Sequence, residues 1–594
     1  MLYSLAGEWQ ASIENGACVP IHLPGTLDEN RIGGRDAGQN QWSPDGVQIK
    51  KGGPILTRLT RRYTYEGEAR FSRRIRFRLP AGERLFLEAE RARCLRLLLD
   101  GEEIPDFLPP TISTPHVFEL TGRWRGEHEI TLLSDNSYPG LPRDAIVYSS
   151  AATDETQTNW NGVLGYFRLR TEKAVFLESV RVYPAGGQLT VKADICAAYP
   201  WSGELSVCSE SLKDAACLPV SVSEGRTEIV LKNLPLREDA ARWDEYEGRL
   251  YSLCALLEGT EEKTVLFGIR DFGANREGRL ALNGRAFFLR GEANCAEFPE
   301  TGHPPMSVEE WTEILETYRS YGVNCMRFHS HCPPEAAFSA ADQLGILMQP
   351  ELSHWNPTDA FESDESFSYY RTELTGILRQ LANHPSFVML TFGNELIASG
   401  KGHRRMDALL KTAHSLDTTR LYANGSNTHY GQLGCDEQSD FYTSNRWHEQ
   451  YLRGTDSNMR GHINEAYPSA AANYNEAMES LRESYAKPVF SFEVGQFEVL
   501  PDFKELQEFK GISDPANLRH IREQVKKKGL LPLWEKYVEA TGELSRIGYR
   551  EEVEAAMRTK QLSGISLLGL QDFPGQGTAL VGMLNSLTFP TFAG

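Results

Sequence analysis

The second half of the chain alternates between strand-like and helix-like segments, and this alternation restricts the fold more than any other feature. Apolar runs that end in polar residues are separated by amphipathic stretches such as "SVEEWTEILETYRSYG", where Ser307 followed by Glu310 indicates a capped helix start. Strands that alternate with helices form parallel sheets, and eight such units close into a barrel. We therefore expect a (β/α)8 TIM barrel over residues 271–594.

Eight runs are predicted barrel strands, in chain order "FFLRGEAN", "VNCMRFH", "ILMQPEL", "FVMLTFGNE", "LYANGS", "DFYTSN", "PVFSFEVG" and "ISLLGLQDF". The charged stretch 503–560 lies between the seventh and eighth runs and has helical character, so it is predicted to be an insertion.

The first part of the chain predicts antiparallel β structure. In "RRIRFRLP", Ile75 and Phe77 alternate with arginines, a period of two with one solvated side. Asp100-Gly101 between extended runs predicts a tight hairpin. We expect an N-terminal jelly-roll β-sandwich over residues 1–173.

Shorter strands follow in the next hundred residues or so. "LTVKADIC" places Leu189, Val191, Ala193 and Ile195 on one side of a strand. Short strands with turn signals are typical of an immunoglobulin-like β-sandwich, which we expect over residues 174–270.

Composition restricts the partners. The 594 residues predict three or four domains, and the net charge of 62 − 81 = −19 disfavours nucleic acid and anionic membranes. The ten cysteines form no CxxC pair, which predicts reduced thiols, and we expect no metal and no cofactor. A homo-oligomer is compatible with the sequence, which does not fix the oligomeric state.

The chain shows no segment typical of membrane insertion. The opening "MLYSLAGEWQ" lacks a signal-peptide pattern, and no apolar stretch reaches membrane-spanning length. We expect a cytoplasmic protein from the sequence as it stands, or a periplasmic or secreted one if a signal peptide has been removed. The chain ends about twenty residues after the last predicted strand, which leaves open whether a C-terminal portion has been removed.

Two carboxylates stand near the ends of predicted strands. Asn394-Glu395 closes the fourth strand, and Glu493 lies near the end of the seventh. Active sites of such barrels lie where the strands end, so we expect the two glutamates to converge. A carboxyl pair about 5 Å apart suits glycosidic bond hydrolysis with retention, and a wider gap suits inversion. Each glutamate alone would more often be a solvated residue or the partner of an arginine.

The segment "NHPSFVMLTFGNE" resembles the acid/base segment of glycoside hydrolase family 2, the β-galactosidase, β-glucuronidase and β-mannosidase group. "SLAGEWQ", "HLPGTLDEN", "RCLRLLLDGEEI", "NGRAFFLRGEAN" and "YGVNCMRFHSHCPPEAAFSAADQLGILMQPE" are similar to further segments of that family. The resemblance implies the domain order jelly roll, immunoglobulin-like sandwich, barrel. It also implies a retaining exo-β-glycosidase that acts on carbohydrate.

The resemblance implies residue roles as well. Glu395 would be the general acid/base and Glu493 the nucleophile. Asn394 would bind the sugar 2-hydroxyl, and Arg327 would position the nucleophile. The remaining implied sugar contacts are His331, His354, Asn445, Trp447 and Tyr451. For each of the two histidines, a structural role is an equally good interpretation.

Departures from the family pattern bear on the sugar. "DFYTSNRWHEQY" resembles a glucuronidase stretch, but Trp447 and His448 replace its tyrosines, so Tyr451 or Tyr442 is left to bond the nucleophile, or neither does. Leu570 stands where the family usually has a tryptophan. The Asn-x-Lys triplet that binds the sugar carboxylate in glucuronidases is absent from the sequence. We therefore expect a β-galactosidase first, with β-glucuronidase, β-galacturonidase or another specificity of the family as the alternative.

Two rival functions remain. A metal-dependent hydrolase is the first rival. His329 and His331 resemble the metal-binding histidine pair of an amidohydrolase, and Asp572 would complete the site, although the two histidines close the second strand rather than the first. The same scaffold could also be a non-catalytic carbohydrate-binding protein, since a fold does not fix a function. The joint presence of Glu395, Glu493, Asn394 and Arg327 favours the enzyme.

Overall fold

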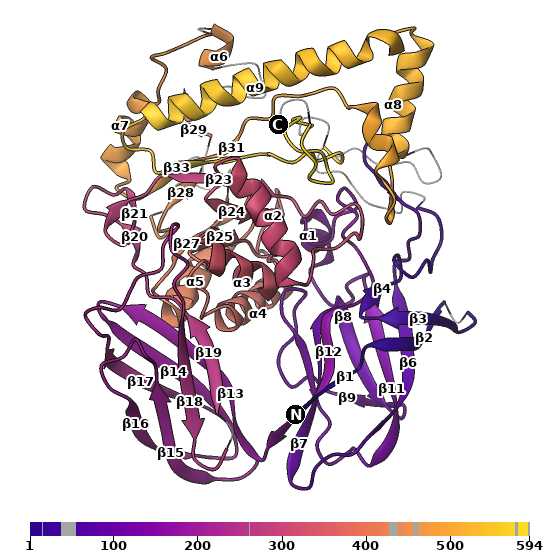
Figure 1. The fold of residues 1–594 in the computed structure, drawn as a ribbon, viewed down its shortest axis with the longest axis vertical. Helices are drawn as coiled ribbons and strands as arrows, with labels where there is room; N and C mark the ends of the chain where they lie inside the picture. The colour runs from indigo at the N-terminus through magenta and orange to yellow at the C-terminus, as the bar shows by residue number, and fades with distance from the viewer. Residues whose placement is uncertain are drawn as a thin grey trace.

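The structure is a computed structural model that describes residues 1–14, 16–36, 55–260, 262–426, 437–443, 445–454, 461–465, 467–576 and 580–591. Two antiparallel β-sandwiches stand side by side, and a barrel of parallel strands with its helices lies above them (Figure 1). No helix among the described residues is both long and apolar enough to cross a membrane.

The first sandwich packs two sheets around one apolar core. One sheet contains β1 (Leu2–Ser4), β12 (Gly162–Lys173), β7 (Glu83–Arg91) and β10 (His116–Glu119), with β4 (Gly25–Thr26) beside β12. The other contains β3 (Val19–Leu23), β2 (Gly7–Ile13), β6 (Glu68–Phe77), β11 (Gly126–Asp135), β8 (Cys94–Leu99) and β9 (Glu102–Ile104).

Two sequence predictions for this sandwich are confirmed. Ile75 and Phe77 are buried in β6. The predicted hairpin joins β8 to β9, with Leu99 paired to Glu102. Asp100 and Gly101 have φ angles of 51° and 88°. A two-residue turn with positive φ at both positions matches the twist of the strands and favours glycine there.

The second sandwich has its own core. Its sheets are β13 (Val175–Ala185), β14 (Gln188–Ala197) and β17 (Gly225–Pro235), and β16 (Ala216–Val222), β15 (Trp201–Cys208), β18 (Tyr251–Leu257) and β19 (Lys263–Phe267). The predicted apolar side of β14 is fully buried, with Leu189, Val191, Ala193 and Ile195 all 0% exposed. A small sheet of β20 (Phe272–Ala274), β21 (Leu280–Leu282) and β22 (Arg285–Ala286) leads into the barrel.

All eight predicted barrel strands are present. They are β23 (Leu289–Asn294), β24 (Cys325–Phe328), β25 (Leu347–Pro350), β26 (Met389–Thr391), β27 (Leu421–Ala423), β28 (Tyr442–Thr443), β31 (Val489–Val494) and β33 (Gly564–Leu567). Six form one parallel sheet, and β26 pairs with β27. Single bridges such as Glu351 to Thr391 join β25 to β26, and the Asp440 amide donates to the Tyr422 carbonyl at 2.8 Å to link the fifth strand to the sixth.

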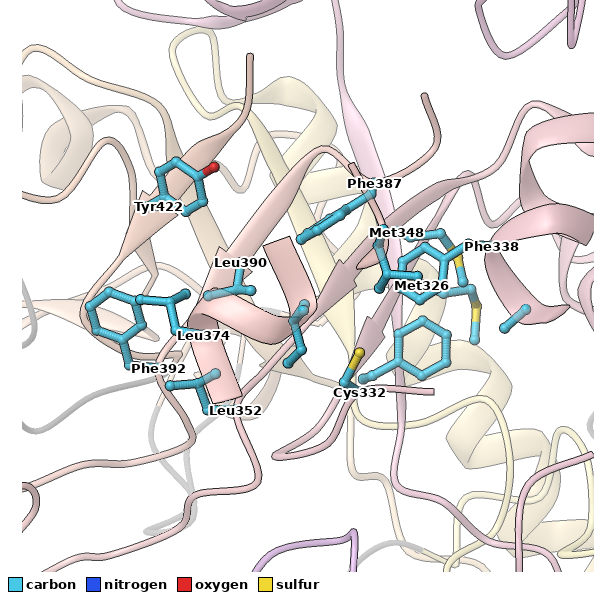
Figure 2. Close-up of a cluster of buried hydrophobic side chains, with 14 of the residues drawn as sticks. Met326, Cys332, Phe338, Met348, Leu352, Leu374, Phe387, Leu390, Phe392 and Tyr422 are labelled. Carbon is cyan, nitrogen blue, oxygen red and sulfur yellow. The ribbon is translucent and has the colours of Figure 1, made fainter. Parts of the chain in front are cut away.

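Helices cover the outside of the barrel: α2 (Val308–Ser320), α3 (Glu335–Leu344), α4 (Asp364–Gln380), α5 (Gly400–Leu416) and α7 (Asn475–Ser484). The predicted cap is confirmed, because the Ser307 hydroxyl accepts from the Glu310 amide. Figure 2 shows the core between strands and helices, where Met348 and Leu390 of the strands lie near Phe338 of α3 and Leu374 of α4. Strands buried on both sides explain why these runs are almost wholly apolar.

The insertion before the last strand contains η1 (Phe503–Gln507), α8 (Ala516–Lys527), η2 (Leu531–Leu533) and the long α9 (Trp534–Arg558), which crosses the top of Figure 1. Its β32 (Ser513–Asp514) pairs with β5 (Thr60–Arg61), so the insertion contacts the connection between β4 and β6 of the first sandwich. The remaining elements are α1 (Arg143–Tyr148), the hairpin of β29 (Arg446–Trp447) and β30 (Gln450–Tyr451), and α6 (His462–Glu465).

Candidate active site

One end of the barrel gathers polar side chains from several strands. Asn394 and Glu395 follow β26, and Glu493 belongs to β31. Backbone bridges continue past the strand end, because Asn394 pairs with both Trp355 and Ser426. The Glu395 amide also donates to the Ser426 carbonyl at 3.0 Å. The neighbouring strands therefore fix the backbone that carries both polar residues.

Arg327 of β24 joins these residues. Its guanidinium is about 1% exposed and makes three hydrogen bonds: Nε to Glu351 Oε1 at 2.8 Å, Nη1 to Glu493 Oε1 at 3.1 Å, and Nη2 to Asn394 Oδ1 at 2.6 Å. The other oxygen of Glu351 accepts from the Ser330 amide at 2.7 Å. A planar guanidinium presents its donors in a fixed fork, so it orients all three partners. Two carboxylates offset its buried charge.

Glu395 is held as an acid. Burial raises its pKa to about 8, with the Glu493 carboxylate as the second cause. A hydrogen bond from the Trp355 side chain and the charges of Arg327 and Arg453 act in the opposite direction. Glu395 is therefore protonated at neutral pH, while Glu493 lies against the Arg327 cation. When the environments of two neighbouring carboxyl groups give them different pKa values, one can act as a proton donor and the other as the ionised group.

Both glutamates have backbone conformations that are unusual for residues with side chains. Their φ angles are 44° for Glu395 and 56° for Glu493. Positive φ costs a non-glycine residue free energy, and such residues concentrate at functional sites. Gly393 precedes this turn at φ 138°, where a Cβ would lie 2.2 Å from the His354 carbonyl oxygen. Gly393 therefore allows the backbone to pass close to His354, and the turn two residues later presents the Glu395 carboxylate.

The two predicted histidines are buried beside the site rather than joined to the carboxylates. His354 is 0% exposed, and its ring stacks on Tyr370 with centroids 4.2 Å apart. Its carbonyl accepts from the Asn394 amide at 3.1 Å, so its backbone supports the site. Nδ1 of His331 lies 3.0 Å from the His329 carbonyl oxygen. Burial lowers the pKa of His331 to about 4, so the ring is neutral.

Two of the predicted sugar contacts near β28 have local partners in the described structure. Trp447 is 2% exposed in an apolar cluster, and its Nε1 donates to the Ser480 hydroxyl of α7 at 3.2 Å. The large ring gains more from this core than from a solvated mouth. Asn445 is half-buried and accepts from the Leu452 amide through its backbone.

The hydrogen bonds seen for the two candidate tyrosines of this region involve groups other than Glu493 in the described part of the chain. The Tyr442 hydroxyl donates to the Arg446 carbonyl at 3.1 Å. Tyr451 is half-buried in β30, and the described part of the chain shows no hydrogen bond between its hydroxyl and Glu493.

Two contributors to the site are not among the predicted site residues. Trp355 contacts Glu395, and its ring packs against His329 with centroids 4.9 Å apart. Trp355 comes soon after the third strand, and this position near the barrel mouth could have pointed to a role in the site. Arg453 is 8% exposed, and its Nη1 donates to the Glu493 carbonyl at 2.6 Å. It lies in an irregular loop after β30, so no strand pattern pointed to it.

The residues of the metal hypothesis have separate partners. His329 Nδ1 lies 3.0 Å from the Ser150 hydroxyl, while Asp572 accepts from the Val581 and Gly582 amides. Within the described ranges, no group of three His, Cys, Asp or Glu residues is arranged to hold a metal ion.

A TIM barrel with two glutamates at its strand ends meets the structural requirement of glycoside hydrolysis by two carboxyl groups. Residues 274–510 match the family model for the TIM barrel domain of glycosyl hydrolases family 2. A β-galactosidase of Vibrio vulnificus strain YJ016 is 27% identical over 211 residues, which are 34% of this chain and 20% of that protein. A putative β-glucuronidase of Formosa agariphila is 29% identical over 194 residues, 30% of this chain and 23% of that protein. The chain thus matches about a fifth of the length of these curated relatives.

Solved structures share the fold over the whole chain. A family 2 β-galacturonidase of Eisenbergiella tayi bound to galacturonate has a TM-score of 0.73 at 15% identity, covering 100% of this chain and 95% of that one. A β-glucuronidase of Bacteroides uniformis has a TM-score of 0.68 at 13% identity, covering 99% and 68%. These similarities support glycoside hydrolase family 2, the family that the sequence motifs resemble.

The charge of Glu493 contributes to the raised pKa of Glu395, so removing that charge should lower this pKa. In Glu493→Gln, the pKa of Glu395 should fall because a like charge is removed, and it should stay above 4.5 because burial, the larger cause, persists. Difference infrared titration of the protonated carboxyl band measures this pKa. The exposed Glu498→Gln variant serves as the charge-matched control if its own titration is unchanged. An unaltered Glu395 pKa in Glu493→Gln would contradict the coupling.

Proposed function

We propose that the chain is a retaining exo-β-glycosidase. One observation carries the proposal: the buried Arg327 holds Glu493 and Asn394 in place beside a glutamate that burial keeps protonated. Glycoside hydrolysis with retention needs a proton donor for the leaving oxygen and a nucleophile for the anomeric carbon. Glu395 and Glu493 meet these two requirements.

The proposed reaction has two displacements. Glu395 donates its proton to the glycosidic oxygen while Glu493 attacks the anomeric carbon and forms a glycosyl ester. Glu395, now ionised, takes a proton from water, and that water releases the sugar with the original configuration. The Asn394 oxygen is engaged by Arg327, so the amide nitrogen is the group that donates to the sugar 2-hydroxyl.

The sugar has two candidates, each with its own support. The curated relatives include several β-galactosidases, which favours a β-galactoside. The similar solved structures include a β-galacturonidase and β-glucuronidases, which favours a β-uronide. The missing Asn-x-Lys triplet means that a uronide would need another cation to bind its carboxylate.

The domain organisation belongs to the same proposal. We assign residues 1–173 to a jelly roll, 174–270 to an immunoglobulin-like sandwich and 271–594 to the catalytic barrel. The separate apolar cores of the two sandwiches support the first boundary, since β12 ends at Lys173 and β13 begins at Val175.

A panel of nitrophenyl β-glycosides tests the activity and resolves the sugar. We expect turnover of the galactoside, the galacturonide or the glucuronide. Glu395→Ala and Glu493→Ala should each lower kcat on the best substrate by about 10²–10⁴-fold or more, because the acid or the nucleophile is lost. Glu498→Ala should keep the wild-type rate. Binding of sugar without turnover of any panel member would support the non-catalytic alternative and refute the proposal.

The raised pKa of Glu395 predicts the alkaline side of the pH profile. The acid must carry its proton, so kcat/KM should be maintained below pH 8 and fall as pH rises through about 8. Initial rates over pH 5–10 with a substrate of poor leaving group measure this. A substrate with a strongly acidic leaving group needs less protonation and should show a weaker fall. An alkaline midpoint near 5 would contradict the protonated state of Glu395.

A further inference from the structure

A small cavity lies between the first sandwich and the barrel. Its volume is about 40 Å³, and residues of both domains line it, among them Arg91, Arg93, Ser150, Thr158, Trp160 and His331. One water needs roughly 10–15 Å³ of such volume. The cavity therefore has room for a small ion or a carboxylate group, but not for a sugar ring.

Two buried arginines form the wall of this cavity. Arg93 is 4% exposed and donates to the carbonyls of Ala151 and Thr158, and its guanidinium lies 4.2 Å above the Trp160 ring. Arg91 is 6% exposed and donates to the carbonyls of Ile112 and Pro333. These protein partners are neutral oxygens. Among the described residues, the Nε atoms of both arginines have no hydrogen-bond partner.

The two guanidinium groups lack a carboxylate at ion-pair distance among the described residues. In the described chain, neither Arg91 nor Arg93 forms an ion pair within 4 Å, whereas the buried Arg181 and Arg327 contact carboxylates. Burial is the largest cause that lowers the pKa of Arg93, and the like charges of Arg61 and then Arg91 lower it further. A buried cation without a counter-charge is costly.

The acidic groups that act on Arg91 are engaged elsewhere. Glu90 accepts from the Tyr166 amide at 3.0 Å, Glu373 bonds Ser113 and Ser353, and Glu335 lies against His384. Carbonyls alone can hold a buried guanidinium, as Arg270 shows. There Nε, Nη1 and Nη2 each donate to a carbonyl. Arg91 and Arg93 differ because the Nε of each lacks a hydrogen-bond partner among the described residues, and both residues line the cavity.

We infer that this cavity binds one small monovalent anion between Arg91 and Arg93. A free ion such as chloride and the carboxylate of a uronide substrate offer the same chemistry to the two guanidiniums, and the second source rests on the proposed function. His331 also has an unpartnered Nε2 here. Its Nδ1 donates to the His329 carbonyl, so Nε2 donates to an anion only when the ring is doubly protonated.

The site is connected to the catalytic residues. The Ser150 amide donates to the Ser330 hydroxyl at 2.9 Å, and the Ser330 amide donates to Glu351, the partner of Arg327. Arg93 holds the same loop through the carbonyls of Ala151 and Thr158. A bound anion that fixes Arg93 therefore also stabilises the loop beside the catalytic cluster.

The first arm of the test uses bromide. At constant ionic strength, replacing gluconate by bromide should raise the Tm of the wild type along a saturable curve, because a ligand of the native state stabilises it. Crystals grown in bromide should show anomalous density in the cavity. Both effects should be lost in Arg93→Met and kept in Arg74→Gln, whose side chain is 75% exposed. If Arg93→Met does not fold, Arg91→Met replaces it.

The second arm separates the sources. If the anion is the substrate carboxylate, Arg93→Lys should lower kcat/KM for an aryl β-uronide at least tenfold more than for the matched neutral glycoside, and bromide should compete with the uronide alone. If it is a free ion, bromide should change kcat/KM of both substrates alike.

The inference is overturned if bromide and gluconate give equal Tm values and Arg93→Lys leaves the uronide preference unchanged. Bromide density that persists in Arg93→Met would mean an adventitious ion only and would also overturn it. Failure to hydrolyse any glycoside would refute the proposed function, while the bromide arm would still decide whether the anion site exists.

Discussion

The site depends on one buried guanidinium. Arg327 links Glu351, Glu493 and Asn394, which come from three other parts of the barrel rim, within 3.1 Å. Removing any partner would leave a buried charge or a polar group unsatisfied, which costs more than the pair itself contributes. The same contact accounts for two properties of the site: Glu493 lies beside a cation, and the amide nitrogen of Asn394 is directed away from the arginine.

The barrel makes this arrangement rigid. Backbone bridges run beyond the strands through Trp355, Asn394 and Ser426, and the positive φ angles at Glu395 and Glu493 are held by these neighbours. Strain of this kind persists only where the surrounding structure over-determines the backbone. The large apolar core between the strands and their helices supplies that support (Figure 2).

The sequence predicted the parts of the molecule that follow from periodicity. Apolar runs that stop at polar residues predicted all eight barrel strands and the strand-end positions of Asn394, Glu395 and Glu493. The spacing of Ser307 and Glu310 predicted the helix cap. The choice of Arg327 came from the family resemblance. The burial of Trp447 and His354 was less predictable. An aromatic ring near the mouth of the barrel can point into the mouth or into the core, and the sequence pattern does not distinguish the two orientations. Arg453 comes from an irregular loop, and Arg91 and Arg93 line a cavity between the first sandwich and the barrel. The periodicity of the sequence predicts neither of these positions.

The central claim is that Glu493 is the nucleophile that Arg327 positions and Glu395 assists. A 2-deoxy-2-fluoro glycosyl fluoride of the preferred sugar should trap the covalent intermediate. The fluorine at C2 slows both displacements, but the good leaving group keeps the first displacement faster than the second, so the glycosyl ester accumulates. Peptide mapping by mass spectrometry should then find one sugar per chain, on the peptide "PVFSFEVGQ" at Glu493. A label on any other residue would contradict the account, as would turnover with inverted configuration and no label.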